Sequence, residues 1–79
     1  MNDAEAREAI SSALARIAPE IEFDEADTTE PMTRELDLDS MDMLSLLEAI
    51  GERTGIHIPE TDVEPTWSID DMVAYLVAR

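Results

Sequence analysis

The sequence predicts an all-α fold, a small four-helix bundle of three main helices and one short helix, with a long loop between the first two main helices. Apolar residues recur at helical spacing in three separate stretches, and residues suited to capping stand at the ends of these stretches. Short returns after the second helix favour roughly antiparallel packing. With 79 residues the chain has room for one small domain, which we assign to residues 1–79.

The first helix is expected to run from about Asp3, its predicted N-cap, to Ala18, because Pro19 opposes its continuation. Its apolar residues are Ala6, Ile10, Ala13, Leu14 and Ile17. The long connection from Glu20 to Asp39 follows, and loops of that length in compact domains are often functional. It carries apolar residues that can pin it onto the helices: Ile21, Phe23, Met32, Leu36 and Leu38.

The second helix is expected to start at Ser40 and to end near Thr54, where Gly55 is suited to a left-handed C-cap. Its apolar stripe comprises Met43, Leu46, Leu47 and Ile50. The segment Ile56–Pro59 should be extended, and residues 60–64 can form the one short helical turn.

The last helix should begin at Ser68, a good N-cap, with Asp70 and Asp71 in the first turn where the helix dipole favours acids. Its predicted apolar face comprises Ile69, Met72, Val73, Leu76 and Val77.

The charge of the chain is extreme: 20 acidic residues stand against five arginines, a formal net charge of −15. Such a chain is repelled by nucleic acid and by anionic membrane surfaces, and it attracts a partner with a basic patch. The alternative is that acidity serves only solubility. No secretory signal and no apolar stretch of bilayer length is visible in the sequence. We therefore expect a cytoplasmic monomer.

An enzyme is not expected. The chain has no cysteine, and its single histidine, His57, lies between two isoleucines in an extended segment where a surface role is the simpler interpretation. No serine has a base at a suggestive spacing.

A calcium loop is also disfavoured. Asp37, Asp39 and Glu48 match positions 1, 3 and 12 of an EF-hand, but Met41 would stand at position 5 and Asp42 at position 6, where the loop needs a ligand and a glycine.

The stretch from Leu36 to Leu44 is the most informative, because it places Ser40 between two aspartates where an acidic connection becomes a helix. One interpretation is structural: Asp39 or Ser40 caps the helix and Asp42 complements its dipole. The other is that Ser40 presents its hydroxyl to another enzyme. As a bare pattern, the structural interpretation is the stronger.

In context, the chain resembles the acyl carrier protein family. Residues 36–42, Leu-Asp-Leu-Asp-Ser-Met-Asp, are similar to that family's Leu-Gly-x-Asp-Ser-Leu-Asp motif at the start of its second helix. Residues 55–60, Gly-Ile-His-Ile-Pro-Glu, resemble the segment after that helix, and residues 68–76 resemble the closing helix. The three motifs lie between residues 36 and 76 and stand at the spacings that the family shows.

The resemblance implies that Ser40 carries a covalent 4′-phosphopantetheine arm, added from coenzyme A by a phosphopantetheinyl transferase. Acyl or aminoacyl groups would be attached to the arm as thioesters. They would be loaded by a ligase and delivered to synthases or transferases with basic docking patches. The residues implied in partner recognition are Asp39, Met41, Asp42, Leu44, Glu48 and Glu52. The pathway would be fatty-acid, lipid or secondary-metabolite biosynthesis.

Several residues depart from the family pattern. Asp37 replaces the usual glycine, Met41 the usual leucine, and Thr54 stands where an aromatic residue usually packs. Glu48, Gly51 and Trp67 are also unusual, and we interpret Trp67 as a packing residue. These differences point to a specialised stand-alone carrier, for secondary metabolism, an aminoacyl group or an unusual lipid, at least as much as to the housekeeping carrier of fatty-acid synthesis. The competing class is an acidic module that binds a basic partner without being modified.

Overall fold

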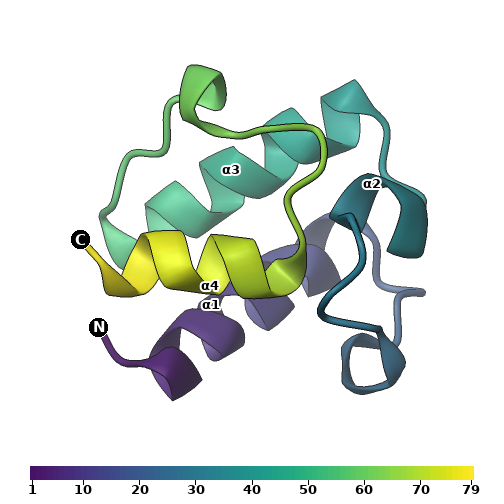
Figure 1. Ribbon diagram of the computed structural model, residues 1–79, viewed down its shortest axis with the longest axis horizontal. Coiled ribbons are helices and arrows are strands. Elements are labelled where there is room, and N and C mark those ends of the chain that lie inside the picture. The colour runs from purple at the N-terminus through teal and green to yellow at the C-terminus, as the bar shows by residue number, and fades with distance from the viewer.

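The computed structural model describes all 79 residues as a bundle of α-helices without strands (Figure 1). The elements are α1 (Asp3–Ile17), the 3-10 turn η1 (Phe23–Glu25), α2 (Met32–Glu35), α3 (Ser40–Thr54), the 3-10 turn η2 (Glu60–Asp62) and α4 (Ile69–Val77). The all-α class and the four-helix bundle with three main helices are confirmed. No helix combines the length and the apolar character that a membrane span requires.

The short α-helix lies in a different place from the predicted one. It is α2, inside the long connection, whereas the turn expected at residues 60–64 is the 3-10 turn η2. Pro31 stands at the N-cap of α2, and Met32 is completely buried. Burial of Met32 and the proline at the N-cap therefore stabilise one turn of α-helix. The acidic composition of the connection did not predict this turn.

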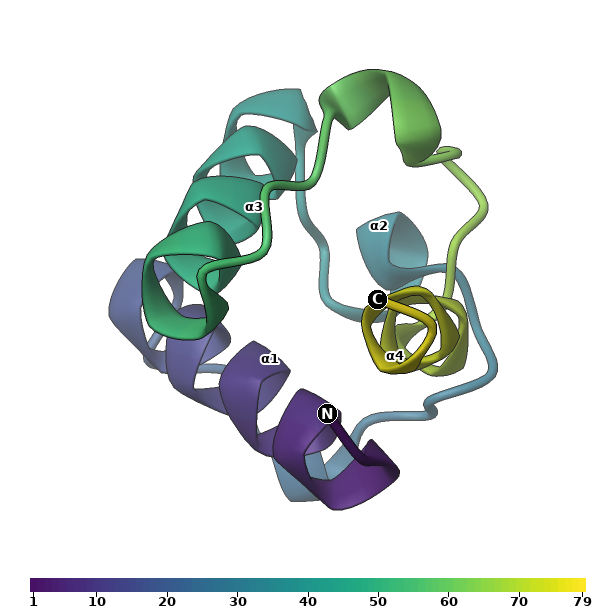
Figure 2. The same ribbon diagram turned by 90° about the vertical axis from the view of Figure 1, so that its left-hand side faces the viewer.

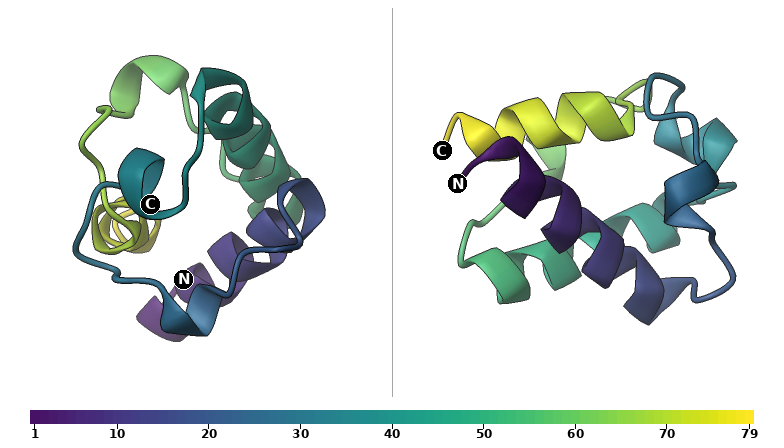
Figure 3. Two further views of the ribbon diagram at one scale, coloured as in Figure 1. Left: turned by 90° about the vertical axis from the view of Figure 1, so that its right-hand side faces the viewer. Right: turned by 90° about the horizontal axis from the view of Figure 1, so that it is seen from below.

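The helices enclose one core, and α1 packs against both α3 and α4. Viewed along α4, α1 and α3 lie to one side, and η2 lies at the top of the view, on the side of α3 away from α1 (Figure 2). Both termini lie at the same end of the bundle (Figure 3). The side chains that are most completely buried are Ile10, Leu14, Met32, Leu46, Ile50, Ile69, Met72 and Leu76.

The first helix starts one residue earlier than its predicted cap implies. Asn2, not Asp3, is the N-cap: its side chain accepts a hydrogen bond from Glu5 N at 2.8 Å, and Glu5 Oε1 accepts one from Asn2 N at 2.9 Å. A capping box needs Glu or Gln three residues after the cap, which Asn2 has and Asp3 lacks. The helix ends at Ile17, because Pro19 disfavours helical geometry at Ala18.

The bounds of α3 and the start of α4 are as predicted. Gly55 ends α3 in the left-handed region at φ 75°, and Ser68 caps α4 in a capping box with Asp71. The prediction that Val77 belongs to the buried apolar face of α4 is wrong, because its side chain is 41% exposed. It occupies the last position of α4, where no other segment covers it.

The long connection is pinned to the bundle by its apolar residues. Met32, Leu36 and Leu38 are buried, and Ile21 and Phe23 are partly buried against the core, as predicted. Backbone hydrogen bonds add to this attachment: Met32 N donates to Trp67 O at 2.9 Å. The connection thereby forms part of the core.

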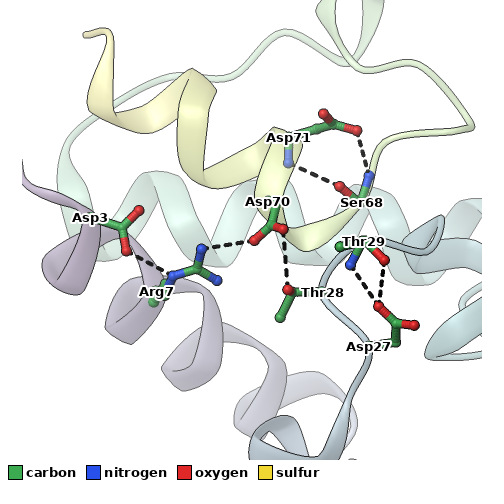
Figure 4. A network of polar contacts seen from close by, with 8 residues as sticks. All are labelled: Asp3, Arg7, Asp27, Thr28, Thr29, Ser68, Asp70 and Asp71. Carbon is green, nitrogen blue, oxygen red and sulfur yellow. Dashed lines mark hydrogen bonds and ion pairs between the residues drawn. The ribbon is translucent and has the colours of Figure 1, made fainter.

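A polar network joins the same connection to α1 and α4 (Figure 4). The Asp70 carboxylate accepts hydrogen bonds from Arg7 Nη2 at 2.8 Å and from Thr28 Oγ1 at 3.2 Å, and Asp70 N donates to Thr28 O at 3.0 Å. Nearby, Asp27 accepts bonds from the hydroxyl and the amide of Thr29, which lower the pKa of Asp27. Three segments distant in sequence therefore meet at Asp70.

Ion pairs also tie α1 to α3. Arg53 contacts Glu8 at 2.6 Å, and Arg16 contacts Glu52 at 2.9 Å. The hydrogen bonds from Arg53 and then from Ser12 hold the pKa of Glu8 below its ordinary value. These side chains are solvent-exposed, so the pairs add little to the free energy of unfolding.

Candidate functional site

Ser40 is the first residue of α3, and the preceding residue, Asp39, is the N-cap of this helix. Asp39 Oδ1 accepts a hydrogen bond from Asp42 N at 2.8 Å, and Asp42 Oδ2 accepts one from Asp39 N at 3.2 Å. This capping box decides between the two residues that the sequence left open as caps. The cap role falls to Asp39, and the Ser40 hydroxyl is exposed beside the positive end of the helix dipole.

The approach to Ser40 is fixed by a residue in an uncommon backbone conformation. Asp37 has φ 52°, and it is the only non-glycine residue with a positive φ. Leu36 and Leu38 on either side are buried. Aspartate tolerates the left-handed region better than most residues. Asp37 therefore makes a turn that a glycine would make with less strain, and the chain emerges from the core at Asp39.

The residues predicted for partner recognition lie along α3 and at its cap. Met41 and Leu44 are 70% and 37% exposed, unusually high values for large apolar side chains in this chain. Glu48 and Glu52 are exposed, and Asp42 is half-buried. The carboxylates differ in their contacts. Those of Asp39 and Asp42 serve the capping box, and that of Glu52 pairs with Arg16.

A hollow of about 270 Å³ opens beside Ser40, and we call it the Ser40 hollow. On the α3 side its lining includes Ser40, Met43, Leu44 and Leu47, and on the far side Glu60 and Val63. The floor is apolar, whereas the far wall comes from η2 and the residues after it. This wall could not be predicted from the sequence, because nothing in the pattern of residues 60–64 indicates which helix they face.

The far wall is held to α4 by side chains near the C-terminus. Tyr75 Oη donates to Asp62 Oδ2 at 2.8 Å, and the Arg79 guanidinium lies 4.1 Å above the Tyr75 ring. The hydrogen bond to Asp62 is the main reason that the pKa of Tyr75 is raised. Trp67 packs against the same ring with its centroid 5.3 Å away, as its interpretation as a packing residue requires.

The structure also places the residues that were considered for catalysis or for calcium binding. His57 is exposed, between half-buried Ile56 and buried Ile58. Asp39, the third position of the hypothetical EF-hand, is occupied by capping, and residues 43–47 stay within α3. The chain has no group of three acidic or histidine side chains placed to hold a metal ion.

The site fits a covalent phosphodiester. The Ser40 hydroxyl is exposed, it stands at the N-terminus of a helix of 15 residues, and it borders an open hollow that leaves room for a substituent. Helix N-termini favour phosphate groups. The carboxylates of Asp39 and Asp42 oppose that preference, but their mutual capping contacts direct them toward backbone amides.

Comparison with known proteins agrees with this fit. Residues 5–76 match the family model described as a phosphopantetheine attachment site. Proteins named acyl carrier protein from Helicobacter pylori strains G27 and HPAG1 are each 31% identical over 62 residues, which is 78% of this chain and 68% of the relative. One from Campylobacter hominis is 40% identical over 42 residues, 53% of each chain. No solved structure matches.

Together, an all-α bundle and a phosphopantetheine attachment domain define a carrier domain and not an enzyme. The chain belongs to the acyl carrier protein family. Its cofactor is accordingly a covalently attached 4′-phosphopantetheine, which supplies the thiol that holds cargo as a thioester.

Proposed function

We propose that Ser40 is the attachment residue and that the chain shuttles acyl or aminoacyl thioesters between partner enzymes of fatty-acid, lipid or secondary-metabolite biosynthesis. The observation that carries the proposal is the exposed Ser40 hydroxyl, left available because Asp39 provides the helix cap. A phosphopantetheinyl transferase joins the Ser40 oxygen to the phosphorus of the arm and releases the nucleotide part of coenzyme A. The proposal includes one domain over residues 1–79, a monomer and a cytoplasmic location.

The test is incubation of the purified chain with coenzyme A and a broad-specificity transferase, followed by intact-mass measurement. We expect one added arm on the wild type and on Ser45→Ala, since Ser45 is another exposed serine of α3. Ser40→Ala should remain unmodified. A wild type that stays unmodified with several transferases contradicts the proposal, as does a modified Ser40→Ala.

Partner docking is proposed to use the exposed surface of α3 and its cap, comprising Asp39, Met41, Asp42, Leu44, Glu48 and Glu52. Support comes from the apolar exposure of Met41 and Leu44 and from the charge of −15, which attracts basic partners at long range. Glu48 has no arginine partner, whereas Glu52 is paired with Arg16. Glu48→Lys should therefore slow modification more than Glu52→Lys at low salt.

The two charge reversals separate docking from general electrostatics. Equal rates for wild type and Glu48→Lys at low salt would contradict the docking surface. The competing class, an acidic module that is never modified, predicts salt-sensitive partner binding that does not change in Ser40→Ala.

A further inference from the structure

The apolar side chain of Met41 has no packing role within the fold. It is 70% exposed, the highest value among the exposed large apolar residues of this chain, and it neither belongs to the core nor packs against it. It is also absent from the lining of the Ser40 hollow, to which Leu44 contributes. The thioether of Met41 is therefore open to solvent, to partners and to small reactive molecules.

The other methionines are better shielded or lie elsewhere. Met32 and Met72 are completely buried, and Met43 is partly buried against the core. Met1 is 38% exposed, but it lies beside the last turn of α3, away from the start of that helix (Figure 1). Met41 is thus the one strongly exposed thioether, and it stands next to the proposed attachment residue.

This exposure matters because a methionine sulfur is open to oxidation. Oxidants convert it to a sulfoxide, and methionine sulfoxide reductases reverse the change. The chain has no cysteine, so before the arm is attached it offers an oxidant no thiol that would react instead. An oxidant must reach a sulfur atom to react with it, and Met41 is therefore expected to react before the buried methionines.

We propose that Met41 is a site of reversible oxidation by hydroperoxides, and that its sulfoxide weakens the docking of partner enzymes at Ser40. The inference rests on the proposed attachment and docking surface. In the step, a lone pair of the Met41 sulfur attacks one oxygen of hydrogen peroxide, so that an S–O bond forms and the O–O bond breaks. The sulfur loses two electrons, and the leaving oxygen takes the proton from the transferred oxygen and departs as water.

The consequence for docking follows from the position of Met41. It directly follows Ser40, so an enzyme that reaches the Ser40 hydroxyl also covers Met41. Met41 and Leu44 are three residues apart on one helix and form an exposed apolar pair. A sulfoxide is polar, and a partner that covers this pair would have to remove water from it without compensation. Asp39 and Asp42 already supply hydrogen-bond acceptors beside the pair, so one more acceptor replaces apolar contact there.

The experiment treats the purified chain with dilute hydrogen peroxide, removes the excess with catalase and locates the added oxygen by mass spectrometry of peptides. We expect Met41 to be oxidised about tenfold faster than Met32 or Met72. Attachment kinetics with coenzyme A and a phosphopantetheinyl transferase then compare the treated chain with the untreated one. For the treated chain kcat/KM should fall about threefold, through a higher KM and not a lower kcat. Methionine sulfoxide reductases with a dithiol should restore it.

Matched variants assign the effect to one sulfur atom, each protein being compared with its own untreated form. Met41→Leu should not respond to peroxide, because leucine has no sulfur. Met43→Leu, which removes a partly buried sulfur instead, should respond as the wild type does. Met41→Gln imitates a polar side chain and should raise KM without peroxide. The treated wild type should keep its circular dichroism and melting temperature, because Met41 is not part of the core.

The outcomes are distinguishable. An untreated wild type that does not gain the arm contradicts the attachment on which the inference rests. Oxidation as fast at Met32 as at Met41, or a loss of helicity on treatment, overturns the modification site. An unchanged KM after oxidation of Met41, or an equal response of Met41→Leu to peroxide, overturns the effect on docking while attachment at Ser40 stands.

Discussion

Two long connections between the main helices cross this small bundle, and they are attached in different ways. The connection from Pro19 to Asp39 buries three large apolar side chains and joins the network at Asp70. The connection from Gly55 to Trp67 buries only Ile58, and its outer part is held by the side-chain contacts of Asp62. The first is part of the core, whereas the second is separated from the start of α3 by the Ser40 hollow.

The largest expected effect compares how much buried apolar side chains of each connection contribute to the free energy of unfolding. Met32→Ala should lower the free energy of unfolding by about 2–5 kcal/mol, because it empties a completely buried position of the first connection. Val63→Ala, in the second connection, should cost no more than about 1 kcal/mol, since Val63 is only half-buried. Urea denaturation measures both. Equal losses would show that the two connections are equally anchored.

The polar attachments differ in a similar way. Asp70→Asn should lower the free energy of unfolding by about 1 kcal/mol, because it weakens charged hydrogen bonds that join α1, α4 and the first connection. Asp62→Asn, at an exposed pair of the second connection, should change it by less than ~0.5 kcal/mol. Thermal unfolding of the two variants side by side checks the order, and a larger loss for Asp62→Asn would reverse the comparison.

Backbone strain is confined to the first connection. Asp37→Gly should raise the free energy of unfolding by about 0.5 kcal/mol, because glycine adopts φ 52° without strain and loses only part of this gain to its greater unfolded-state freedom. Glu64→Gly, at an exposed position of the second connection without a positive φ, should be destabilising. Chemical denaturation distinguishes the two signs.

The smallest expected effect is a pH dependence at the second connection. The pKa of Tyr75 is raised above 10.0 in the folded chain, so its protonated form stabilises the fold below that pH, and this contribution is lost as pH rises through the folded pKa. As the pH rises above about 10, the melting temperature of the wild type should therefore fall more than that of Tyr75→Phe. Parallel slopes for the two proteins would contradict the role of the Tyr75–Asp62 bond.

The residues that the sequence predicted well are those whose behaviour depends on near neighbours. Ser40, Thr54 and Gly55 delimit α3 because caps and left-handed glycines act within one helical turn. The apolar stripes of α3 and α4 followed from helical periodicity, apart from Val77 at the end of α4. Asn2 could have been found, since Glu5 follows it at the spacing of a capping box.

The missed features depend on contacts between distant segments. The helix α2 forms where Met32 is buried, and its backbone amide bonds to Trp67 O, thirty-five residues away in sequence. Likewise, Glu60 and Val63 face Ser40 only because the second connection returns beside α3. No local pattern encodes such encounters.

By itself, the sequence determined the three main helices, the acidity and the family resemblance, because periodicity, composition and short motifs are local properties of the chain. Only the tertiary structure decided that Arg16 pairs with Glu52 while Glu48 has no such partner, and that the Ser40 hollow opens between α3 and η2. The physical reason is that an ion pair between two helices and a hollow between two segments depend on how those segments are placed in three dimensions, and that placement is fixed by packing of the whole core.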